Sequence, residues 1–121
     1  MIQPESEKPV IMFIARQHSG ETFSSFIIHG LINSLISQGS PFADLREQLE
    51  FWIVPMVNID GVVLGNYRTN CQGRDMNRSF FPIDEYVSMT SLSQPYITVK
   101  EVDDIQNFVA KETYQSGPLK G

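Results

Sequence analysis

Two short apolar runs constrain this chain more than any other feature of its sequence. Residues 9–15 read PVIMFIA and residues 51–57 read FWIVPMV, and both runs are short and rich in branched or aromatic side chains. Such runs favour strands that are buried on both faces of a parallel sheet over helices. Pro55 lacks a backbone N–H, which predicts that it lies at a sheet edge or at the end of the second strand.

The residues between and after these runs predict helices and a functional loop. Residues 22–37 repeat apolar side chains at helical spacing, so they can connect two parallel strands. A second, shorter helix is expected at residues 41–48, capped by Ser40. The sequence NIDG at residues 58–61 predicts a turn. Residues 65–82 have no sustained period, which predicts a long ordered loop of the kind that carries function.

The last predicted element is a helix that opens with a capping box of Thr98 and Glu101 and ends near Lys111. The side chains expected on its buried face are Val102, Ile105, Phe108 and Val109. The whole order predicts an α/β fold, part of a mixed, mostly parallel sheet with flanking helices. Because two strands form a poor sheet, we expect this fold to be incomplete within the sequence.

Composition excludes several classes of protein. The length of 121 residues suits one domain, and a net charge of −5 argues against binding to nucleic acid. The first apolar run soon gives way to polar residues, so neither a signal peptide nor a membrane segment is indicated. The single cysteine, Cys71, cannot form an internal disulfide, which is typical of a reducing compartment. We therefore expect a cytoplasmic location and no membrane partner.

His18 and Glu21 form the first candidate site. They lie three residues apart, directly after the first predicted strand and at the start of a helix. Ligands of open α/β sheets gather beyond the carboxyl ends of the strands, and an imidazole and a carboxylate at this spacing can converge on a metal. On these residues alone, the simpler interpretation is an acid that favours the helix dipole beside an incidental surface histidine, because this spacing of histidine and glutamate is frequent by chance.

A catalytic zinc needs three protein ligands, and the sequence offers one further histidine as a candidate. His29 lies eleven residues beyond His18, which along a helix is a distance of roughly 16 Å. That distance excludes a shared coordination sphere. We therefore interpret His29 as a structural histidine.

The second candidate site consists of Arg68, Asn77 and Arg78. Guanidinium groups bind carboxylates through paired, charge-assisted hydrogen bonds, and an amide adds a neutral donor that fixes orientation. The segment around them is positively charged within an acidic chain. The alternative is an exposed loop whose arginines pair with Asp75 and Asp84, as surface ion pairs commonly do.

Three ordered motifs together resemble a known family. They are ARQHSGETFSSF at residues 15–26, VPMVNIDGVVLGNYR at residues 54–68 and GRDMNRSF at residues 73–80. The chain resembles zinc metallocarboxypeptidases of the carboxypeptidase A type, in the cytosolic carboxypeptidase or tubulin deglutamylase branch. The resemblance implies that residues 1–121 are part of a catalytic domain that hydrolyses C-terminal residues, glutamates in this branch, from acidic protein tails such as those of tubulin.

The resemblance also implies roles in metal binding and catalysis for residues of both candidate sites. His18 and Glu21 match the first two ligands of Zn²⁺, and Arg68 matches the catalytic arginine that polarises the scissile carbonyl. The family's third ligand is a histidine on a strand after the last helix, and its general base is a glutamate further on. Neither has a counterpart in these residues, so the resemblance leaves open whether this chain is an enzyme.

Substrate binding follows from the same resemblance. Asn77 and Arg78 match the pair that binds the terminal carboxylate, and Arg74 is a weaker candidate for binding an acidic side chain. Ser19 and Ile59 depart from the pattern, because the branch usually has proline at both positions. These changes concern the rigidity of the loops more than the chemistry.

Two other functions remain open at this point. The chain can be an inactive module that binds acidic C-terminal tails through Arg68, Asn77 and Arg78 without hydrolysing them. It can also belong to the related acyl-amino-acid deacylase branch, which shares the pair of histidine and glutamate. The second and third motifs fit that branch less well.

Overall fold

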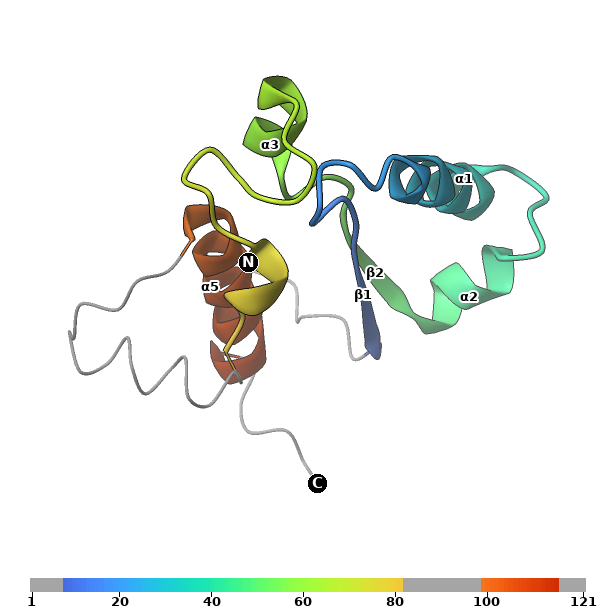
Figure 1. Ribbon diagram of the computed structural model, residues 1–121. Coiled ribbons are helices and arrows are strands. Elements are labelled where there is room, and N and C mark those ends of the chain that lie inside the picture. The colour runs from blue at the N-terminus through green and yellow to red at the C-terminus, as the bar shows by residue number, and fades with distance from the viewer. Residues whose placement is uncertain (1–7, 82–98, 116–121) are drawn as a thin grey trace.

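The computed structural model describes residues 8–81 and 99–115, in which two parallel strands form the sheet. Strands β1 (Val10–Ile14) and β2 (Glu50–Val54) pair from one end to the other, with Ile14 opposite Val54. Helices α1 (Phe23–Ile36) and α2 (Ala43–Gln48) connect them and lie on one side of the sheet, while α5 (Lys100–Gln115) lies on the other (Figure 1). The α/β prediction is confirmed.

The strands are exposed to a degree that the sequence did not predict. Strand β2 ends at Val54, directly before Pro55, as the missing N–H of proline requires. However, every residue of both strands is half-buried or exposed, so the prediction of strands buried on both faces is wrong for the described residues. A sheet of two strands has two edges and no central strand, which leaves part of each face uncovered.

The connection after α1 differs from its prediction in one detail. Ser40 does not cap α2, since the helix begins after Phe42 without a side-chain cap. Instead the Ser40 hydroxyl donates to the carbonyl of Ser34 and accepts from the backbone N–H of Phe42 at 3.1 Å. Ser40 therefore stabilises the turn between the helices, because its short hydroxyl competes well for nearby backbone groups.

The predicted turn at residues 58–61 is instead the start of helix α3 (Ile59–Leu64). The buried Asn58 is its N-cap, and its side-chain oxygen accepts from the backbone N–H of Gly61 at 2.9 Å. Gly65 ends the helix in the left-handed conformation. The turn prediction was wrong because Asn58 and an aspartate in the first turn are residues that turns and helix starts share.

Residues 65–81 form the predicted loop, which contains one short 3₁₀ helix, η1 (Met76–Arg78). The loop is tied to α5 by the buried side chain of Gln106, whose amide donates to the carbonyl of Phe81 at 2.7 Å and accepts from its N–H at 3.3 Å. Thr98 lies outside the described residues, so the capping box stays a prediction. No helix in the described part of the chain is long and apolar enough to cross a membrane.

The core lies where the loop meets α5 and the residues after β2. Its buried members are Val57, Met76, Val99 and Val102, with Ile14, Val54, Phe80 and Ile105 packed against them. Phe108 was predicted to be buried but is 44% exposed, although its ring packs against that of Trp52 in a T-shaped arrangement with 4.8 Å between centroids. The core therefore joins the loop and α5 to the carboxyl ends of both strands.

Met76→Ala tests this assignment of the core. Met76 is 0% exposed, so truncation removes its apolar contacts and leaves a cavity, and we expect a loss of about 2–5 kcal/mol in the free energy of unfolding. Val63, which is 79% exposed on α3, provides the control, and Val63→Ala should change this free energy by less than about 0.5 kcal/mol. Urea unfolding measures both, and equal losses in the two variants would contradict the assignment.

Candidate functional site

The loop between β1 and α1 carries the first candidate residues. The imidazole Nδ1 of His18 lies 3.0 Å from Oε1 of Glu21, and His18 itself is only 6% exposed. Arg16 shapes this loop from its start. Its backbone has a φ of 54°, and its side chain donates to the carbonyl of Ser19 at 2.8 Å and to the hydroxyl of Ser25 at 2.7 Å. The pair is therefore held on a fixed turn.

Asp75 connects this loop to the arginine-bearing segment. One carboxylate oxygen, Oδ1, lies 3.1 Å from Nε2 of His18, and the other, Oδ2, accepts from Nε of Arg68 at 2.6 Å. The first oxygen also accepts from the backbone N–H of Asn77 at 2.9 Å, which caps η1. The side chain of Asp75, which is 19% exposed, thus contacts both Arg68 and a histidine that lies 57 positions away from Asp75 in the sequence.

The charge of Asp75 is favoured by these contacts. Partial burial alone would raise the pKa of Asp75, but the hydrogen bonds from Arg68, His18 and the backbone of Asn77 together lower the pKa below its ordinary value. Asp75 therefore stays ionised over a wide range of pH. The sequence indicated Asp75 only as an ion-pair partner of nearby arginines, because its contact with His18 arises from the fold.

The structure brings together some of the predicted residues and leaves others apart. His18, Glu21 and Arg68 form one cluster through Asp75, and Asn77 joins it through its backbone. The other two arginines are placed differently. The guanidinium of Arg78 donates to the carbonyl of Asn77 at 3.0 Å.

Arg74 is exposed, and only its backbone takes part in hydrogen bonds among the described residues, with Asn70. His29 is exposed on α1 with its Nε2 atom 3.2 Å from the amide nitrogen of Asn33. This placement fits the structural role predicted for His29.

The chemistry of the donor set fits two ligands of a zinc site. Zinc bonds to imidazole nitrogen and carboxylate oxygen are about 2.0–2.2 Å long, which in a tetrahedron separates two ligand atoms by roughly 3.4 Å. The separation of 3.0 Å between His18 Nδ1 and Glu21 Oε1 is close to this value. Asp75 faces the opposite ring nitrogen, so it cannot share the same metal ion. Within residues 8–81 and 99–115, no three or more histidine, cysteine, aspartate or glutamate side chains are placed so that they could hold one metal ion together.

Comparisons with known proteins agree on one family. A family model described as zinc carboxypeptidase matches residues 2–115. Cytosolic carboxypeptidase 6 of Mus musculus is 42% identical over 99 residues, which cover 82% of this chain and 18% of the mouse protein. Cytosolic carboxypeptidase 6 of Caenorhabditis elegans is 45% identical over 74 residues, which cover 61% of this chain and 16% of the nematode protein.

Solved structures show the same similarity in three dimensions. A metallo-carboxypeptidase from Burkholderia cenocepacia has a TM-score of 0.67 and 29% identity, covering 90% of this chain and 27% of that protein. A metallo-carboxypeptidase from Pseudomonas aeruginosa also has a TM-score of 0.67 and 29% identity, covering 91% of this chain and 26% of that protein. The chain therefore spans less than a third of the length of each relative.

Asp75→Asn tests the bridging role of this carboxylate in the metal-free protein. Because the pKa of Asp75 is lowered on folding, its stabilising contribution is complete above the ordinary pKa of about 3.9 and is lost as the pH falls through the lower, folded-state pKa. The free energy of unfolding should therefore differ more between wild type and Asp75→Asn at about pH 6 than at about pH 3. Urea titrations in the presence of a chelator measure this difference.

Asp104→Asn is the matched control for that experiment. Asp104 also pairs with a basic side chain, Lys100, at 2.7 Å, but both partners are well exposed to solvent. Exposed pairs contribute about 0–1 kcal/mol, so this variant should differ little from wild type at either pH. A difference for Asp75→Asn that is equally small, or that does not change with pH, would contradict the bridging role.

Proposed function

Because this chain belongs to the zinc carboxypeptidase family, we propose that it supplies part of the active site of a zinc-dependent metallocarboxypeptidase that acts on acidic protein C-termini. The observation that carries the proposal is the cluster around Asp75, in which one carboxylate contacts both His18 and Arg68. A metal ligand and a catalytic arginine must lie close together to act on the same scissile bond. The motifs of the family do not by themselves show that His18 and Arg68 lie close together in space.

In this proposal His18, through Nδ1, and Glu21 hold the zinc ion. When bound, zinc polarises the carbonyl of the substrate and makes a water molecule more acidic. Asp75 positions the imidazole, because a neutral imidazole that uses Nδ1 as a ligand has its N–H on Nε2, which faces Asp75 at 3.1 Å. The carboxylate thereby favours the tautomer that leaves Nδ1 free to bind metal.

Arg68 is proposed to stabilise the oxyanion that forms from the scissile carbonyl. Its Nε–H is used by Asp75, while its two terminal nitrogens have no hydrogen bond to another described residue. The side chain is 44% exposed, so these nitrogens are accessible to a substrate. A guanidinium held at one edge and open at the other can meet a developing negative charge without reorganising.

The terminal carboxylate of the substrate is proposed to bind Asn77 and Arg78, with Arg74 contacting an acidic side chain. The exposure of all three residues supports this proposal, as does the local excess of arginine. The solved relative from Pseudomonas aeruginosa is in complex with (2-guanidinoethylmercapto)succinic acid, which has two carboxyl groups. The names of relatives that are called cytosolic carboxypeptidases support a cytosolic location. Acidic tails, such as those of tubulin, are proposed as substrates because the segment around Arg68 is positively charged and because the motifs resemble that branch of the family.

Zinc binding to the 121-residue chain tests the metal-binding part of the proposal. We expect calorimetry to show zinc binding in wild type and in His29→Ala, because His29 is remote from the site on α1. In His18→Ala the affinity for zinc should fall by roughly tenfold or more, since one of the proposed ligands is lost. Equal affinities of the His18→Ala and His29→Ala proteins would rule out His18 as a ligand.

A pair of peptides tests the substrate-binding part. We expect a glutamate-ended peptide to bind more tightly with a free C-terminal carboxylate than with an amidated one. Arg78→Ala should reduce the affinity for the free form by roughly tenfold to a hundredfold, because hydrogen bonds to charged groups contribute most to recognition. Lys111→Ala removes an exposed positive charge from α5 and serves as the charge-matched control.

Equal binding of the two peptides to wild type would contradict the carboxylate site. Mass spectrometry of the same mixtures tests hydrolysis directly. Release of glutamate would support the peptidase and exclude a module that only binds. Binding without release is expected of both functional classes, because the described residues supply only two of the three protein ligands that a catalytic zinc needs.

A further inference from the structure

The loop with His18 and Glu21 also holds the backbone next to Arg68. The hydroxyl of Ser19 donates to the carbonyl of Asn66 at 2.5 Å, and the backbone N–H of Gly20 donates to the carbonyl of Tyr67 at 2.7 Å. Ser19 and Gly20 are the two residues between the proposed metal ligands. The same four residues therefore carry both ligands and grip two consecutive peptide units that precede Arg68.

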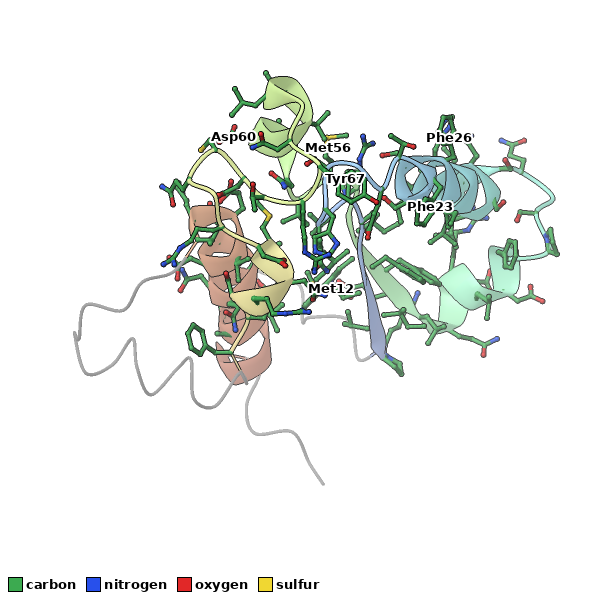
Figure 2. All side chains as sticks on the ribbon, viewed as in Figure 1. Met12, Phe23, Phe26, Met56, Asp60 and Tyr67 are labelled. Carbon is green, nitrogen blue, oxygen red and sulfur yellow. The ribbon has the colours of Figure 1, made fainter. Side chains whose placement is uncertain are left out.

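The approach of the two segments is close. A Cβ atom on Gly20 would lie 2.3 Å from a ring carbon of Tyr67 and 2.9 Å from its carbonyl oxygen, so only glycine fits at this position. Figure 2 shows Tyr67 beside the loop that leads into α1. Ser19 is 4% exposed, and a buried hydroxyl is costly to leave without a partner. The close contact between the two segments thus depends on the hydroxyl of Ser19 and on the absence of a side chain at Gly20.

The backbone carbonyl of Arg68, the residue after Tyr67, is held by a different part of the chain, the N-cap residue of α3. The amide of the buried Asn58 reaches the carbonyl of Arg68 at 3.4 Å, so three consecutive carbonyls each accept a hydrogen bond from another part of the chain. The guanidinium of Arg68 is held in turn by Asp75. A long side chain keeps a set direction only if both its backbone and its charged end are constrained.

We propose that Ser19 is a positioning residue, whose hydroxyl bond to Asn66 sets the place of Arg68 relative to His18 and Glu21. Gly20 assists by allowing the close approach of Tyr67. The functional meaning of this clamp rests on the roles proposed above for the metal ligands and for Arg68. The clamp itself requires neither metal nor substrate, so it can be tested without them.

The test is nitrogen-15 NMR of the arginine side chains in the metal-free chain, with the Arg68 Nε–H signal assigned from an Arg68→Lys variant. In Ser19→Ala we expect this Nε–H and the amide of Gly20 to exchange with solvent roughly fivefold to tenfold faster, because one hydrogen bond of the clamp is lost. Ser24→Ala is the matched control, since the Ser24 hydroxyl also donates to a carbonyl of this loop, that of Glu21 at 2.7 Å, but does not touch residues 66–68.

Two variants of the same shape separate the effect of the Ser19 hydroxyl from the effect of changed packing. Ser19→Thr and Ser19→Val add the same bulk at this buried position, but only threonine keeps the donor. We expect wild-type exchange in Ser19→Thr and Ser24→Ala, and faster exchange in Ser19→Val. Circular dichroism checks that each variant is folded.

Slow, wild-type exchange in both Ser19→Ala and Ser19→Val would overturn the proposal, and so would equally fast exchange in Ser19→Thr and Ser19→Val. These two outcomes of the exchange measurement do not depend on whether the proposed function is correct. A chain that fails to bind zinc or peptide leaves the exchange comparison unchanged, whereas a failed exchange comparison leaves the zinc and peptide results unchanged.

Discussion

The carboxylate of Asp75 is the contact on which the rest of the site depends. It accepts from the imidazole of His18 and from the guanidinium of Arg68, and it caps η1 through the N–H of Asn77. Charge-assisted bonds of this kind are stronger than neutral ones, and partial burial protects them from water. If this carboxylate were lost, the loop of His18 and Glu21 would still be joined to the segment before Arg68 by the hydrogen bonds of Ser19 and Gly20 to the carbonyls of Asn66 and Tyr67.

Hydrogen bonds between buried side chains and the backbone explain how the irregular loop at residues 65–81 stays ordered. Residues 65–81 have little regular structure, so their polar groups need partners elsewhere. Buried asparagines supply many of them. Asn70 accepts from the N–H groups of Gln72 and Arg74 with one side-chain oxygen, and Asn58 reaches the carbonyl of Arg68. The loop is held by amide side chains from inside and by Gln106 of α5 at its end.

The sequence predicted the elements of this fold better than their burial. Apolar period and length identified β1, α1 and α5, because these signals are local. The exposure of Phe108 and the open faces of β1 and β2 depend on what packs against them, which local patterns do not contain. The start of helix α3 was interpreted as a turn, because Asn58 and Asp60 are residues that occur both in turns and at the starts of helices.

In the site, too, the sequence indicated contacts between neighbouring residues but not contacts between residues that are far apart in the chain. The spacing of His18 and Glu21 pointed to a shared metal, and the structure places their side chains 3.0 Å apart. Asp75 and Ser19 were missed as site residues because their contacts span 57 and 47 positions of sequence and leave no periodic trace. Side chains that bond to a distant backbone or ring become visible only in three dimensions.

Nitrogen-15 NMR of the two histidine rings during a zinc titration shows whether the fold presents Nδ1 of His18 to a metal while Asp75 holds Nε2. We expect zinc to change the Nδ1 signal of His18 to that of a metal-bound nitrogen, while Nε2 keeps its proton and His29 is unaffected. Zinc bound to Nε2 of His18, or equal changes at both histidines, would contradict this expectation.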